Sequence, residues 1–171
     1  MDVPAWLAQL KLPPLPEALP SAVADSHTHL DSTREYSGLP VEASLEAARL
    51  VGVGWLVEVG CDVDSSRIAV DLAAAYPQVV AAVAMHPNDA ARSATLDDDI
   101  AAIDALARAG DHVRAIGETG LDHYRTTDEA LFAVQERSFV EHIAIARRYE
   151  KTLVIHHRDA HADLVRAPAV R

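Results

Sequence analysis

Short apolar runs alternate with segments of helical spacing along most of this chain. The runs occur at residues 22–27, 55–59, 79–84, 113–117 and 152–156. They are continuous rather than alternating, which is typical of strands buried on both faces of a parallel sheet. The segments between them carry apolar residues at three- and four-residue spacing, as in the long amphipathic stretch 128–149. The pattern therefore predicts an α/β fold built from repeated β/α units.

A few residues mark helix starts and a change in character near the N-terminus. Asp64 and Thr95 are expected to cap two of the predicted helices. Four prolines follow Trp6–Leu10, which has the composition of a single helical turn, and prolines favour extended backbone. We expect residues 1–21 to be a proline-rich N-terminal extension and residues 22–171 to form one domain.

Polar side chains gather where the predicted strands end. His27 and His29 close the first strand, and residues two apart on a strand point the same way. Two imidazoles on one rigid element are a common start of a metal site. Exposed or capping histidines are the alternative for this pair.

Glu118 ends the fourth predicted strand, with Gly117 and Gly120 beside it. An ionised carboxylate at a buried strand end requires a cation or strong hydrogen bonds. A solvated loop carboxylate is the alternative. Because a carboxylate can bridge two cations, and two close cations suit hydrolysis of phosphate esters, Glu118 is the predicted catalytic carboxylate and a metal ligand.

His156 ends the fifth predicted strand and is the next predicted metal ligand, whereas His157 points to the opposite face. Arg158 can bind a phosphate in a bidentate fork, although a surface arginine fits its position equally well. His86 and Asp122 complete the substrate-binding candidates. His86 can otherwise hydrogen-bond a turn, and Asp122 can instead orient a metal ligand or pair with an arginine.

The formal net charge of −11 argues against a broad basic surface for nucleic acid. It does not exclude an enzyme that engages phosphates through bound cations. The single cysteine, Cys61, excludes an intrachain disulfide. The sequence shows neither the pattern of a signal peptide nor that of a membrane span, so we expect a cytoplasmic protein with no membrane partner.

Taken together, these motifs resemble those of the TatD family of metal-dependent deoxyribonucleases, within the wider amidohydrolase-like barrels. The matching segments are DSHTHLD at 25–31, VGCD at 59–62, AVAMHPNDA at 82–90, AIGETGLDHYR at 115–125, QERSFVEHIAIA at 135–146 and VIHHRDAH at 154–161. They follow the family's order. GETGLD and the HHRDA-type segment are specific to the family, whereas HxH alone also occurs in other metal hydrolases.

The resemblance implies a TIM-type (β/α)8 barrel that binds one or two divalent cations. The family favours magnesium, and mixed histidine and carboxylate ligands also suit zinc or manganese. It implies that His27 and His29 ligate one cation, that Glu118 bridges, and that His156 ligates the second. The implied function is a metal-dependent phosphodiester hydrolase that acts on DNA as a 3′-to-5′ exonuclease. Another metal-dependent hydrolase of small esters or amides, or a non-catalytic remnant, is the alternative.

The chain departs from the family in its length. Family members continue into a second half that carries a further histidine ligand and an aspartate, the expected general base. Only about the first five β/α units are recognised here, whereas a closed barrel needs eight strands. We therefore expect a C-terminally truncated, open partial barrel with little nuclease activity and with self-association through open sheet edges.

Overall fold

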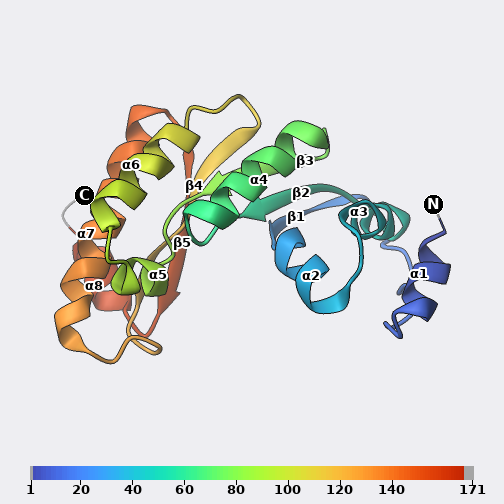
Figure 1. Cartoon of the computed structure of the whole chain (residues 1–171), viewed down its shortest axis with the longest axis horizontal. Coiled ribbons are helices and arrows are strands. Elements are labelled where there is room, and N and C mark those ends of the chain that lie inside the picture. The colour runs from blue at the N-terminus through green and yellow to red at the C-terminus, as the bar shows by residue number, and fades with distance from the viewer. Residues whose placement is uncertain (1, 168–171) are drawn as a thin grey trace. The chain divides into compact units, whose positions relative to one another are not determined.

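The computed structural model describes residues 2–167 of the chain. The chain divides into two compact units, residues 1–58 and 59–171. Strands alternate with helices as the sequence predicts (Figure 1), and the strand pairs described below are all parallel. The predicted α/β class is therefore confirmed. The predicted domain boundary at residue 22 stays a prediction, and residues 168–171 of that domain lie outside the described residues.

The first unit contains two paired strands and three helices. Its elements in chain order are α1 (Val3–Gln9), β1 (Val23–Thr28), α2 (Leu30–Ser37), α3 (Val41–Leu50) and β2 (Val53–Val59), of which the last residue belongs to the second unit. β1 and β2 pair in parallel. Val3 and Leu7 of α1 share a buried cluster with Leu39 and with Ala43 of α3. The N-terminal segment thus contributes a packed helix, where the sequence indicates only one helical turn.

The second unit contains three further strands and the helices that cover them. Its elements are α4 (Val63–Ala75), β3 (Val79–Val83), α5 (Pro87–Arg92), α6 (Leu96–Leu106), β4 (Val113–Asp122), the 3-10 turn η1 (Glu129–Leu131), α7 (Phe132–Arg148), β5 (Thr152–Arg158) and α8 (His161–Arg166). β4 lies between β3 and β5 and pairs in parallel with both. α4 packs on β3 and α7 packs on β4 (Figure 1).

The predicted cap of α4 is wrong by two residues. Asp62, not Asp64, is the N-cap, and its Oδ1 accepts the backbone N–H of Ser65 at 2.8 Å. The Ser65 hydroxyl in return accepts the backbone N–H of Asp62 at 3.0 Å, which completes a capping box. Asp64 instead pairs with Arg67 on the exposed face. The predicted cap Thr95 does precede α6, although its side chain makes no capping hydrogen bond.

β4 extends well past the predicted end at residue 117. The segment 118–122 reads as a loop in the sequence because it contains glycine, aspartate and glutamate, which are depleted in strands. Parallel pairing with β5 nevertheless keeps it extended, with Thr119 opposite Ile155 and Asp122 opposite Arg158. This extension carries the polar residues of GETGLD alongside those of β5.

None of the helices in residues 2–167 combines the length and apolar character needed to cross a bilayer.

Candidate metal centre

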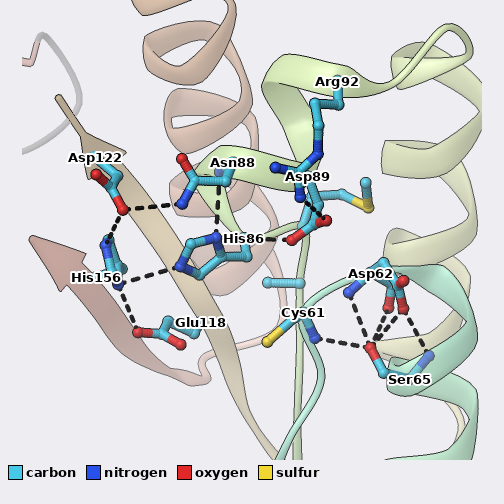
Figure 2. Close-up of polar contacts among 12 residues, drawn as sticks. Cys61, Asp62, Ser65, His86, Asn88, Asp89, Arg92, Glu118, Asp122 and His156 are labelled. Carbon is cyan, nitrogen blue, oxygen red and sulfur yellow. Dashed lines mark hydrogen bonds and ion pairs between the residues drawn. The ribbon is translucent and has the colours of Figure 1, made fainter. Parts of the chain in front are cut away.

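β4 and β5 bring Glu118 and His156 into contact. The two strands pair with Gly120 opposite His156. Nδ1 of His156 lies 2.8 Å from Oε1 of Glu118, and both side chains are largely buried (Figure 2). The second unit therefore joins two of the four predicted metal ligands directly.

Two glycines allow β4 to approach β5 this closely. A Cβ atom at Gly117 would overlap the side chain and backbone of Val154, and one at Gly120 would overlap the backbone of His156. Gly120 also has a φ of +147°, a conformation that strains any residue with a side chain. The glycines beside Glu118 thus have a packing reason that the sequence alone does not reveal.

His86 lies beside this pair, at the start of α5. Its Nδ1 accepts the backbone N–H of Asn88 at 3.2 Å, which caps the helix. Its Nε2 lies 3.2 Å from Nδ1 of His156, and the two rings meet edge to face (Figure 2). Burial, followed by the charge of His156, lowers the pKa of His86, so the neutral imidazole is favoured.

Asp122 contacts His156 from the other side and is fully buried. Its Oδ2 lies 3.2 Å from Nε2 of His156 and accepts the side-chain amide of Asn88 at 2.9 Å. Its Oδ1 accepts the backbone N–H groups of Tyr124 at 3.0 Å and Arg125 at 2.8 Å. Burial alone raises a carboxyl pKa, but the hydrogen bonds from Arg125, Asn88 and His156 outweigh it, so the pKa of Asp122 is lowered.

A network of buried hydrogen bonds holds Asp122 and Asn88 in place. Gln135 of α7 accepts the backbone N–H of Asp122 at 2.9 Å and donates to the hydroxyl of Thr126 at 2.9 Å. That hydroxyl donates to Oδ1 of Asn88 at 2.9 Å. Sequence reasoning missed Asn88, Thr126 and Gln135. The one available signal was a glutamine on the inner face of an amphipathic helix, where an apolar residue is expected.

This donor set fits a divalent cation. His86, Asp122 and His156 each offer a ligand atom within 4.8 Å of the others, and Glu118 adds a carboxylate beside His156. Imidazole nitrogen and carboxylate oxygen together suit zinc and manganese, and carboxylate oxygen suits magnesium. An ionised carboxylate 2.8 Å from a ring nitrogen also requires a proton or a cation between the two atoms.

His27 and His29 belong to the first unit. Their ring centroids lie 5.1 Å apart, and both line an open pocket of about 630 Å³ together with Asp25 and Tyr36. His29 also precedes the first residue of α2. Their convergence with Glu118 and His156 stays a prediction.

Glu58 anchors the strand end that carries these histidines, and sequence reasoning missed it. Its buried carboxylate accepts the backbone N–H of Leu30 at 2.9 Å and the hydroxyl of Thr28 at 3.0 Å. Burial raises the pKa of Glu58, and the hydrogen bonds from Leu30 and Thr28 oppose that rise. A glutamate within the apolar run at 55–59 was the signal that could have identified it.

Arg158 lies next to an exposed aromatic ring. Its guanidinium carbon lies 3.8 Å from the ring centroid of Tyr124, a residue that is 58% exposed. Stacking fixes the plane of the guanidinium without using its N–H donors. The predicted phosphate-binding role of Arg158 stays a prediction, to which the structure adds Tyr124 as a neighbour.

Parallel β/α units thus carry an imidazole and carboxylate cluster at the ends of neighbouring strands. Residues 24–168 match the family model described as TatD related DNase. The chain therefore belongs to this family, as the sequence motifs indicate.

Some similar proteins are named only as metal-dependent hydrolases, and one is named as an exonuclease. A Mycobacterium tuberculosis protein named "uncharacterized metal-dependent hydrolase TatD" is 37% identical over 146 residues, which are 84% of this chain and 54% of the relative. The "3′-5′ ssDNA/RNA exonuclease TatD" of Dickeya dadantii is 38% identical over 125 residues, which are 71% of this chain and 44% of the relative. The chain thus spans about half the length of the curated relatives it matches.

Solved structures agree on the fold. The TatD homologue YjjV of Escherichia coli matches with a TM-score of 0.73 and 30% identity, over 84% of this chain and 53% of YjjV. A TatD family hydrolase from Entamoeba histolytica matches with a TM-score of 0.67 and 19% identity, over 88% of this chain and 54% of that protein, which bears on the fold alone. The fold is a partial TIM-type barrel, and the predicted fold class is confirmed.

Proposed function

We propose that this chain carries the first half of a divalent-metal phosphodiesterase site that cleaves DNA from its 3′ end. The observation that carries the proposal is the contact of Glu118 with His156 at 2.8 Å, in a chain of the TatD family. The Dickeya relative supports the choice of substrate, since its name specifies single-stranded DNA and RNA and the 3′-to-5′ direction.

The proposed roles follow the chemistry of each side chain. His27 and His29 would ligate one cation, Glu118 would bridge to a second, and His156 would ligate that second cation. Bound cations supply Lewis-acid stabilisation of the charge that develops on the phosphate oxygens. They also allow a chain of net charge −11 to hold a polyanion.

Arg158 and His86 are the proposed contacts for substrate. The guanidinium of Arg158, stacked on Tyr124, presents N–H donors in the planar geometry that fits a phosphate. The exposed ring of Tyr124 offers its other face to a nucleobase, because single-stranded nucleic acid is commonly held by stacking on aromatic side chains. Tyr124→Ala should therefore raise KM more than it lowers kcat.

We commit to a divalent cation rather than to one element. The family favours magnesium, whereas three histidines in the proposed ligand set favour zinc or manganese. Elemental analysis of the purified chain before and after chelation identifies the metal.

We also retain the sequence-based expectation of a cytoplasmic protein.

The decisive assay mixes a molar excess of this protein chain with single-stranded DNA that is labelled at its 3′ end. Magnesium, manganese or zinc is added in turn. We expect release of labelled nucleotide that stops with chelator and with Glu118→Gln, and persists with Glu136→Gln, a matched change at an exposed glutamate of α7. The rate should lie about 10²–10⁴-fold below that of the Dickeya exonuclease, because the aspartate expected as general base is not among the motifs recognised in this sequence and a general base contributes about that much.

A parallel panel of small carboxylic and phosphate esters tests the alternative function, a hydrolase of small esters or amides. The broader name of the Mycobacterium relative favours this alternative. Metal-dependent cleavage of small esters with no cleavage of DNA would replace our proposal with that of a small-molecule hydrolase. Metal binding without cleavage of any substrate would leave only the non-catalytic remnant.

A further inference from the structure

We infer that Glu58 is a positioning residue that keeps the ring of His29 available to a cation. Glu58 caps the start of α2 from the neighbouring strand β2, so the ring of His29 is not needed as the cap. The inference rests on the proposed function, in which His27 and His29 ligate one cation. Glu58 and the residues that it contacts all belong to the first unit.

His29 lies where a side chain commonly folds back onto the backbone. It is the N-cap residue of α2, directly before Leu30. The first N–H groups of a helix have no partner within the helix, and the side chain of the N-cap residue often accepts one of them. The ring of His29 makes no such hydrogen bond. It meets the ring of His27 instead, edge to face, with ring centroids 5.1 Å apart.

Glu58 supplies the acceptor that α2 needs. Glu58 is only 1% exposed, and both of its carboxylate oxygens accept the backbone N–H of Leu30, at 3.0 and 2.9 Å. Oε1 also accepts the N–H of Asp31, at the longer distance of 3.4 Å. Oε2 accepts the hydroxyl of Thr28 at 3.0 Å. The carboxylate therefore holds the residues on both sides of His29 and satisfies the first two N–H groups of α2.

His86 shows the other arrangement of a histidine at a helix start. It is the N-cap residue of α5, and its Nδ1 accepts the N–H of Asn88, the second residue of that helix, at 3.2 Å. Asp31 is the second residue of α2, and its N–H donates to Glu58 instead. Capping thus occupies one ring nitrogen of His86, whereas the ring of His29 is not committed to its helix.

Glu58→Leu removes the acceptor and leaves the N–H of Asp31 to the ring of His29. We expect this ring to turn toward α2 and cap it, away from His27. The affinity of His29 for zinc should fall about 10–100-fold, the usual cost of removing a group that orients a metal ligand. Glu58→Asp, whose carboxylate ends one methylene short of α2, should act in the same direction and replaces the leucine variant if that variant does not fold.

Glu58→Gln is the conservative variant and should retain the zinc affinity. Its amide oxygen can accept the first N–H groups of α2, and its NH₂ group can donate to the hydroxyl of Thr28. That hydroxyl can then donate to the carbonyl oxygen of Val57, which lies 3.0 Å away. Glu35→Leu, at an exposed position of α2, is the control and should leave the affinity unchanged.

The measurement is imidazole ¹⁵N NMR of the whole chain, labelled at histidine and titrated with zinc. His29→Gln and His156→Gln identify the signals of these two residues. In the unsubstituted chain zinc should shift both signals. In Glu58→Leu the His29 signal should need more zinc, whereas the His156 signal should shift as before, a difference that a general loss of folding would not produce.

A metal-free measurement tests the capping itself. His29→Ala should lower the urea midpoint of unfolding further in the Glu58→Leu or Glu58→Asp chain, where the ring caps α2, than in the unsubstituted chain, where it does not. Equal shifts in the two backgrounds would overturn the inference. Full zinc affinity of His29 without the Glu58 carboxylate would overturn it too, as would a loss of affinity in Glu58→Gln.

The outcome for the proposed function is separate. Unequal urea shifts with no zinc shift at His29 in the unsubstituted chain would remove the proposed ligand role of His29 and leave the release of its ring by Glu58 standing. Metal-dependent DNA cleavage together with full zinc affinity in Glu58→Leu would do the reverse.

Discussion

Acidification should destabilise the second unit through His142, a histidine of α7 that is fully buried. Its Nε2 accepts the backbone N–H of Met85 at 3.0 Å, and its Nδ1 lies 2.7 Å from the carbonyl oxygen of Ser138. The ring is therefore neutral, with its proton on Nδ1. Burial lowers the pKa of His142 to about 4, although the hydrogen bond to Ser138 opposes that change.

The direction and size of the effect follow from proton linkage. In the unfolded chain His142 regains an ordinary pKa of 6.5, so below this pH the unfolded state binds a proton that the folded state excludes. The contribution of neutral His142 to the free energy of unfolding is fully present above pH 6.5 and is lost as the pH falls toward about 4. Because one pKa unit corresponds to about 1.36 kcal/mol, the loss across this window is on the order of 3 kcal/mol.

Urea unfolding followed by far-UV circular dichroism, at a series of pH values across this window, measures the loss. His142→Gln removes the titration, and His161→Gln, at an exposed position of α8, is the matched control. We expect the free energy of unfolding of the parent chain and of the His161 variant to fall more steeply with acid than that of the His142 variant. Equal slopes for all three chains would refute the reasoning.

Three further predictions concern the close approach of β4 and β5, a buried hydrogen-bond acceptor and self-association of the chain. Gly117→Ala should destabilise the chain by about 1–3 kcal/mol because the added methyl group overlaps β5, whereas Gly54→Ala, with no neighbouring atom within 4 Å, should be nearly neutral in the same denaturation assay. Glu58→Leu leaves buried donors without an acceptor and should cost about 2–4 kcal/mol, read by tryptophan fluorescence; an equal loss from the exposed-site control Glu35→Leu would contradict this. The end strand β5 exposes 44% of Ile155, so light scattering should show concentration-dependent association that Ile155→Lys reduces. A parent chain that stays monomeric would contradict the last prediction.

The local pattern of the sequence was enough to identify the strands and the polar residues at their ends. Continuous apolar runs predicted parallel strands buried on both faces. The strand pairs are parallel, but burial on both faces holds for β3 and is wrong for β1, which is almost wholly exposed, and for β5, which has no buried residue. The carboxyl ends of parallel strands lie at one edge of a sheet, so Glu118 and His156 were expected together, and they lie 2.8 Å apart. These inferences needed only residue type and spacing within one element.

Pairings between distant elements were decided only by the tertiary structure. The GETGLD segment has little strand propensity of its own, and its extended form depends on its register with β5. Asn88, Thr126 and Gln135 come from separate segments, and their donor and acceptor roles exist only because the fold brings them to Asp122. A periodic pattern records which face of an element is buried, but a hydrogen bond depends on the position of two partners, and in this chain those partners lie far apart in sequence.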